Sequence, residues 1–427
     1  MKNKRISNSI LYFFLLITSG LLFGNSNALK TSRKNLLSGG TAKVNITPEM
    51  PVRMSGYADR KEPFSGIHDS LYAVALVFSD GKNKVAIVTS DLISLSSAFC
   101  FETADLIEKE TGISKENIML SSAHNHGGPV VSGNNVTPDE VMYFSRLQKK
   151  IIQAVTEASQ NLQPILLGSG KGICNMNINR RARFADGNIG LGRNPDGPCD
   201  HDVLVVRIDD IDHNPLAVFV NWPCHGTVSG KGNTYITGDW PGATARVVEK
   251  AFGNKIVVPV TAGASGNINP IYGPNESYFR DMDAIGMLLG EEVIDISKKI
   301  HTSSGGSVKM VKKTILAKGK KGLKDRSPNQ KLESGDDVEI ILTVLKVGDI
   351  LFAGISGELF TEIGMRIKAE SVMKNIIVTT HCNGTSGYLC TDEAYPLGGY
   401  EIMVTKTMPG TESLIKENLL GMIKSIK

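Results

Sequence analysis

The chain has 427 residues, of which 41% are hydrophobic and 21% are charged, a composition typical of a globular protein with one large domain or two smaller ones. The formal net charge is +4, and it falls to +1 once the three basic residues of the first five positions are removed. A near-neutral chain gives no electrostatic argument for nucleic-acid binding, so we expect no nucleic-acid partner.

Residues 1–28 have the layout of a cleaved secretory signal. A basic start precedes an apolar run over 10–23, and small and polar residues follow up to Ala28. A membrane anchor is the alternative, but the run is short for a bilayer span and contains Ser19 and Gly20. We therefore expect an exported protein, periplasmic or secreted, with no transmembrane segment after cleavage and at most peripheral membrane contact.

Predicted strands and helices alternate along the rest of the chain. A helix begins at the capping box of Thr137 and Glu140, with Pro138 at its first position, and apolar residues then recur at helical spacing. The polar stretch 317–337 predicts a surface hairpin or insertion. Further helices are expected over 243–252, over 281–300 and from 412 onward. Apolar runs predict strands at 71–78, 84–89, 118–121, 216–220, 256–260, 340–344, 350–355 and 376–379.

This alternation predicts an α/β fold with mixed sheets flanked by helices. Six cysteines follow the signal, and Cys174–Cys199 and Cys382–Cys390 are possible disulfide pairs whose formation the sequence leaves open. None of the cysteine spacings is that of a zinc finger.

Polar, glycine-rich segments follow several predicted strands, where α/β folds bind their ligands. His124 and His126 stand two apart in SSAHNHGGP, a common zinc-ligand spacing, and in an extended segment they would point the same way. A chance pair of loop histidines is the alternative. His225 directly follows a strand and is either a ligand or a hydrogen-bonded structural residue. Asp239 could cap the next helix or hold a metal-bound histidine.

Two further segments complete the candidate site. The run AGASGNINP at 262–270 follows a strand and could present backbone N–H groups to an oxyanion. Glu358 opens a helical pattern, where it could simply interact with the helix dipole. Tyr388 lies thirty residues further on and would ordinarily be a packing residue with a solvated hydroxyl.

Together these segments resemble, in order and spacing, the catalytic domain of the neutral ceramidase family. HNHGGP at 124–129 is similar to the family's H-T-H-S-G-P, NWPCHGT at 221–227 to N-W-x-x-x-H-G-T, TGD at 237–239 to S-G-D, and GELF at 357–360 to P-G-E-F. The resemblance implies one zinc ion per chain, which the family holds with two histidines, a glutamate and a tyrosine. In this sequence those ligands fall on His124, His225, Glu358 and Tyr388. The resemblance also implies that His126 lies near the reacting carbonyl and that Arg180 lines the pocket.

Two departures from the family pattern bear on the substrate. The family's catalytic serine lies in G-D-x-S-P-N, but 266–271 reads GNINPI and places Asn269 at that position. We expect residues 29–427 to form one hydrolase domain, without the family's C-terminal immunoglobulin-like domain. Both departures put ceramide itself in doubt as substrate, and neither touches the implied zinc ligands.

The resemblance therefore predicts zinc-dependent hydrolysis of an N-acyl amide bond by metal-activated water, on a small-molecule or lipid substrate. His126 would donate a hydrogen bond to the oxyanion or shuttle a proton, and Asn269 would offer its amide N–H₂ to the same oxyanion. Arg180 would orient a polar or anionic part of the substrate. The alternatives are a hydrolase of a non-lipid acylated or carbohydrate-linked substrate at the same site, and a non-catalytic binding relative.

Overall fold

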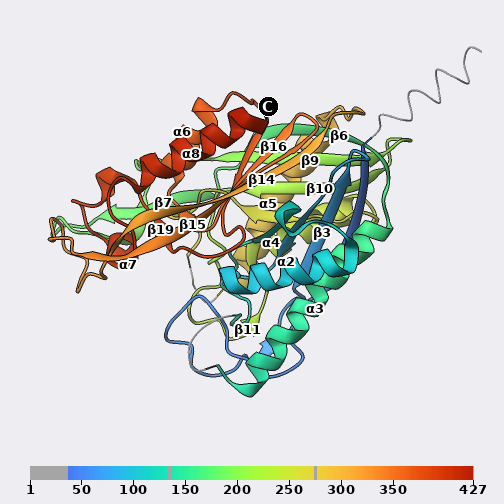
Figure 1. The fold of residues 1–427 in the computed structure, drawn as a ribbon. Coiled ribbons are helices and arrows are strands. Elements are labelled where there is room, and N and C mark those ends of the chain that lie inside the picture. Colours follow the sequence, from blue (N-terminus) through green and yellow to red (C-terminus); the bar gives the residue numbers. More distant parts are fainter. Residues whose placement is uncertain (1–36, 132–135, 274–276, 427) are drawn as a thin grey trace, which may run out of the picture.

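The computed structural model describes residues 37–131, 136–273 and 277–426. The predicted signal at 1–28 lies outside these residues. Two large sheets form the centre of the molecule, and helices cover their outer faces (Figure 1). None of the helices in the described ranges combines the length and apolarity that crossing a bilayer requires.

The larger sheet has eight strands in the order β12-β10-β9-β6-β1-β3-β4-β5. The pairs β4–β5 and β10–β12 are parallel, and the other neighbours in this sheet are antiparallel. Its strands are β1 (Ser38–Asn45), β3 (Tyr72–Ser79), β4 (Lys84–Ser90), β5 (Ile118–Ser122), β6 (Gln163–Ile173), β9 (Asp202–Asp210), β10 (Pro215–Trp222) and β12 (Val260–Ala262).

The second sheet has four strands in the order β14-β15-β16-β18, and its last pair is parallel. These strands are β14 (Val308–Lys320), β15 (Ser334–Val347), β16 (Ile350–Ile355) and β18 (Ile376–Thr379). Three small sheets lie beside the two large ones. They consist of β2 (Gly66–Ile67) with β11 (Tyr235–Ile236), of β7 (Asn177–Arg183) with β8 (Ile189–Asn194) and β13 (Ile268–Pro270), and of β17 (Glu358–Leu359) with β19 (Tyr388–Leu389).

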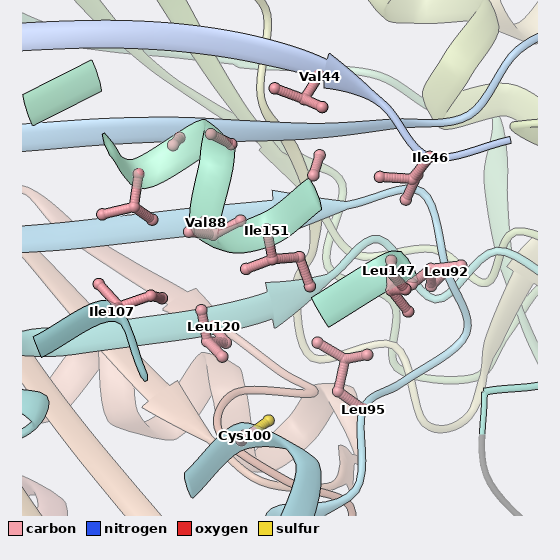
Figure 2. Packing of buried hydrophobic residues seen from close by; sticks show 14 of the residues in the cluster. Val44, Ile46, Val88, Leu92, Leu95, Cys100, Ile107, Leu120, Leu147 and Ile151 are labelled. Carbon is pink, nitrogen blue, oxygen red and sulfur yellow. The ribbon is translucent and has the colours of Figure 1, made fainter. Parts of the chain in front are cut away.

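Alternating side chains of the large sheet face two different layers, as the two-residue period of a strand requires. On β4, Ala86 and Val88 belong to a cluster under α2 (Ser97–Thr111) and α3 (Pro138–Gln160), which Figure 2 shows from close by. Val85 and Ile87 instead pack with side chains of the second sheet, among them Leu345 and Phe352. The two sheets therefore pack face to face, and strands such as β4 and β16 are buried on both faces.

The remaining helices cover the outer faces of the two sheets. Side chains of α4 (Asp239–Ala251) and α5 (Tyr278–Lys299) pack on β9 and β10. Those of α6 (Thr361–Glu370) and α8 (Thr411–Ile426) pack on the second sheet, above which the two helices lie in Figure 1. The short α7 (Tyr400–Val404) lies near β19 and β8. The arrangement is a four-layer sandwich of helices, sheet, sheet and helices.

Most predicted elements are confirmed, including the mixed α/β fold. The capping box of α3 is present, with Thr137 accepting from the Glu140 backbone and the Glu140 side chain accepting from the Thr137 backbone. The polar stretch 317–337 is confirmed as the connection of a long antiparallel hairpin, β14–β15. The strand predicted over 256–260 is wrong, because β12 begins only at Val260. Pro259 has no N–H for the ladder, so pairing with β10 before it is limited to an isolated bridge at Val257.

Candidate metal centre

His124 and His126 lie in the loop that leaves the carboxyl end of β5. The prediction of an extended segment is wrong here, because His124 has a φ of 57°, in the left-handed region. The two rings nevertheless meet at nearly a right angle, with their Nε2 atoms 3.3 Å apart. A tight turn, rather than strand alternation, therefore directs both imidazoles to one point.

His225 reaches the same point from the loop after β10. Backbone hydrogen bonds join the two loops, from His126 N to Gly226 O at 2.9 Å and from Gly226 N to His124 O at 3.2 Å. The rings of His124, His126 and His225 form a group whose ligand atoms all lie within 4.8 Å of one another. This group could hold a metal ion.

Glu358 and Tyr388 come from the far end of the chain and are register partners in the parallel pair β17–β19. One carboxylate oxygen of Glu358 lies 3.2 Å from Nε2 of His225 and 3.4 Å from Nε2 of His124. The Tyr388 hydroxyl accepts a hydrogen bond from Arg180 at 3.0 Å, and Arg180 also contacts His225. All four residues that the resemblance implies as ligands therefore lie around one small, buried region.

The donor set of this region fits a cation. Backbone carbonyls lie beside Nδ1 of both histidines: Ile93 O is 3.0 Å from that atom of His124, and Ser265 O is 2.7 Å from that atom of His225. A carbonyl only accepts, so in a neutral ring at either position Nδ1 carries the proton and Nε2 presents its lone pair. Two such lone pairs and a carboxylate oxygen repel one another at these distances, and a nearby positive charge relieves the repulsion: Arg180 supplies one beside His225, and a metal ion between the three would supply another. Imidazole nitrogen and carboxylate oxygen are ligands that zinc accepts.

Burial and neighbouring charges shift the titration of the group. Burial lowers the pKa of His225 to about 4, and Arg180 adds to the effect. Burial and the neighbouring histidines hold the pKa of His126 well below its usual value. For Glu358, burial alone would raise the pKa, but His124 and His225 outweigh it and hold the pKa well below normal. The imidazoles of His126 and His225 are therefore neutral near pH 7 and the Glu358 carboxylate is ionised, as metal ligation requires.

Arg180 is committed to protein partners. Its Nε donates to Glu401 at 2.8 Å, and Nη1 lies 3.1 Å from Nε2 of His225 and 3.3 Å from Oδ1 of Asn269. Glu401 also accepts from Arg181 at 2.8 Å and is only 1% exposed. A metal ion and the Arg180 N–H cannot use the same lone pair of His225. A metal ion on Nε2 of His225 would therefore take the place of that Arg180 contact, and the separate bond from Nε to Glu401 would not compete with it.

The structure gives specific contacts for Asp239 and for the segment 262–270. The Asp239 carboxylate accepts from the backbone N–H groups of Val228, Ser229 and Trp240, so it shapes the loop after His225 rather than holding an imidazole itself. In the segment 262–270, the carbonyl oxygens of Ser265 and Ile268 contact Nδ1 of His225, so this segment orients the imidazole, and its role toward an oxyanion stays a prediction.

Sequence reasoning missed His381. Its ring stacks on that of His124, with centroids 3.9 Å apart and planes 11° from parallel. The side chain is 2% exposed, and neither ring nitrogen has a hydrogen-bond partner among the described residues. His381 lies in the loop after β18 and has a φ of 55°. It belongs to none of the motifs or apolar periods that the sequence shows.

Comparison with known proteins shows the family of the chain. The N-terminal region of the neutral/alkaline non-lysosomal ceramidases matches residues 38–275, more than half of the chain. The chain belongs to this ceramidase family. The matched segment contains the three histidines of the metal group together with Arg180 and Asn269, whereas Glu358 and Tyr388 lie beyond it.

Relatives of the ceramidase family support this assignment. The chain is 26% identical over 280 residues to neutral ceramidase B of Dictyostelium discoideum, a match that covers 61% of this chain and 38% of that protein. It is 25% identical over 255 residues to the neutral ceramidase of Drosophila melanogaster, covering 55% and 36% of the two chains. The chain thus spans under two fifths of the length of these relatives. A crystal structure of the neutral ceramidase from Pseudomonas aeruginosa has the same fold, with a TM-score of 0.78 at 19% identity, over 92% of this chain and 74% of that one.

Proposed function

We propose that this ceramidase-family chain hydrolyses an N-acyl amide bond with one zinc ion, held by His124, His225, Glu358 and Tyr388. The observation that carries the proposal is the convergence of two Nε2 lone pairs and a carboxylate oxygen, with both Nδ1 atoms facing backbone carbonyls. A zinc ion bound there would polarise the substrate carbonyl and lower the pKa of a water molecule toward neutrality.

His126 is the candidate for proton transfer. Its Nε2 lies 3.3 Å from Nε2 of His124, and the ring is 9% exposed. A neutral imidazole at this position can donate a hydrogen bond to the oxyanion of the reacting carbonyl or pass a proton to the leaving amine.

Asn269 takes the position that the family's serine occupies in the sequence pattern. Arg180 supports a donor role for it, because a guanidinium only donates and so turns the amide oxygen of Asn269 toward itself. The Asn269 N–H₂ group then faces away from Arg180 and is available to an oxyanion. In this proposal Arg180 positions Asn269 and Tyr388, and water rather than a side chain attacks the carbonyl.

The test combines metal content with activity. Purified protein should contain about one zinc per chain by elemental analysis. His225→Ala should lose the metal and the hydrolysis together, since it removes one ligand and leaves the Glu358 carboxylate without that partner. His213→Ala is the matched control. His213 lies exposed in the turn between β9 and β10, and its ring contacts the Thr302 side chain.

A substrate panel decides the class of bond. Ceramide, water-soluble N-acyl amides, O-acyl esters and acylated sugars should be compared on the same preparation. Hydrolysis of amides supports the proposal, and hydrolysis of esters or acylated sugars alone would move the activity to the non-lipid alternative. Wild-type protein that binds zinc but hydrolyses none of the panel would favour a binding relative, which the replacement of the serine by Asn269 also allows.

We further propose that the chain is exported through the signal at 1–28. N-terminal sequencing of protein recovered outside the cytoplasm should begin at Leu29. An intact Met1 terminus confined to the cytoplasm would contradict export.

A further inference from the structure

A pocket of about 350 Å³ lies beside the metal centre. Its wall comes from residues 53–58 and from Arg60 and Lys61, all between β1 and β2, together with Ile93, Val130 and Val131. The segment is held in place by backbone bonds to the loop after His126, such as Ser55 N to Gly128 O at 2.9 Å and Val130 N to Arg53 O at 2.8 Å. The pocket is therefore part of the same rigid framework as the histidine loop.

The pocket shares a wall with the reacting groups. Gly56 packs so closely on His126 that an added Cβ would lie 2.5 Å from its Nδ1. The Tyr57 ring meets the His126 ring edge-on at 5.3 Å, and Ile93 provides the carbonyl that contacts Nδ1 of His124. A substrate that reaches past these wall residues would place its carbonyl at the metal centre and a second group in the pocket.

The charge of the pocket is positive. Arg60 donates to the carbonyls of Ser55, His126 and Gly230 at 2.6–2.8 Å, and these acceptors carry no negative charge. Lys61 is exposed, and in the described ranges no carboxylate lies within 4.0 Å of Arg60 or Lys61. The third basic residue of the wall, Arg53, pairs with Glu140 at 2.7 Å.

Further features favour an anion there. Burial lowers the pKa of Arg60 and outweighs the opposing interactions, among them that with the Asp239 carboxylate. Burial also raises the pKa of Tyr57 to about 12, so Tyr57 remains a neutral O–H donor near neutral pH. Arg180, in contrast, is already matched by Glu401.

We propose that this pocket binds an anionic group of the substrate, a carboxylate, sulfonate or phosphate, and that the enzyme acts on N-acyl compounds that carry such a group near the amide. This inference rests on the proposed amide hydrolysis. It assigns the recognition of the anion to Arg60, Lys61 and the Tyr57 hydroxyl, and it makes a neutral amide the poorer substrate.

The experiment compares a matched pair of substrates, N-hexanoylglycine and its neutral analogue N-hexanoylglycinamide, on the zinc-loaded protein. At low ionic strength kcat/KM should favour the anion by about threefold to tenfold, the effect of unit charges a few ångströms apart at a partly exposed site. The preference should shrink at about 1 M salt, where the screening length is about 3 Å. N-hexanoyltaurine and N-hexanoyl-phosphoethanolamine then rank sulfonate and phosphate against carboxylate.

Lys61→Gln removes one charge without touching the hydrogen bonds of Arg60, so the anion preference should fall. Lys82→Gln is the control, because Lys82 is exposed in the β3–β4 turn, at the other end of these strands from the site. Calorimetric titration with the same two amides measures their binding affinities independently of turnover. If the anion binds more tightly than the neutral amide and Lys61→Gln weakens that binding, the anion pocket is supported. If neither amide is hydrolysed at the same time, only the proposed hydrolysis is contradicted. Equal binding, or a preference that Lys61→Gln leaves unchanged, overturns the inference.

Discussion

Replacing Glu401 by glutamine removes a buried carboxylate that holds two arginines beside the metal centre. Glu401 accepts from Arg180 and from Arg181 at 2.8 Å each, and all three side chains are less than a tenth exposed. A glutamine in the same place has one oxygen and one N–H₂ group, so one guanidinium N–H would face another donor. The variant therefore keeps the volume and loses the charge.

The expected cost is large because the two arginines cannot regain water. Removing one partner of a buried ion pair destabilises a protein by about 3–5 kcal/mol, since the remaining charge is left uncompensated. Glu370→Gln is the control, because it measures the stability cost of removing a surface ion pair. Glu370 binds Lys416 at 2.8 Å but is 46% exposed, and such pairs contribute about 0–1 kcal/mol.

Urea denaturation of both variants measures the difference in the free energy of unfolding. Trp222 and Trp240 are fully buried in the same cluster, so their fluorescence reports the loss of the core. Glu401→Gln should lower the midpoint clearly, and Glu370→Gln should hardly move it. If the two variants cost the same, the argument from burial of the Arg180–Glu401–Arg181 ion pairs is wrong.

Three further predictions follow from single contacts. Asn269→Ala should keep zinc and lower kcat by about 10²–10³-fold if its N–H₂ group stabilises the oxyanion; an unchanged kcat would exclude that role. His381→Ala should weaken zinc binding by about 10- to 100-fold in a chelator competition, because the ring that stacks on His124 is lost, and His381→Phe should restore most of the affinity. Hydrogen bonds from Arg53 lower the pKa of Glu140, so its contribution to stability is present above the unfolded pKa of about 4.3 and is lost as the pH falls through the folded value. Glu140→Gln should therefore cost stability at neutral pH and little in strong acid, and a cost independent of pH would contradict this.

Local signals in the sequence determined most of the secondary structure. The capping box of Thr137 and Glu140 and the apolar spacing after it define α3, because helix initiation and amphipathic periodicity depend on residues a few positions apart. The short apolar runs define β4, β5, β16 and β18 because these strands are buried on both faces. The run at 256–260 was wrong, since a single proline decides where pairing begins.

The candidate ligands could be named from the sequence only through the family resemblance. Their meeting depends on tertiary contacts: the register that sets Glu358 beside Tyr388 pairs residues thirty positions apart, and the bridge between the loops of His124 and His225 joins residues a hundred positions apart. No local period encodes such pairings.

By itself, the sequence determined the fold class, the family and the residue types that a zinc site needs, because these are written in short runs and motifs. Only the tertiary structure decided the tautomers of His124 and His225, the engagement of Arg180 by Glu401 and the stacking of His381 on His124. Each of these features depends on which carbonyl, carboxylate or ring lies within a few ångströms of the side chain. The packing of the folded layers sets that distance, and the neighbouring residues in the sequence do not.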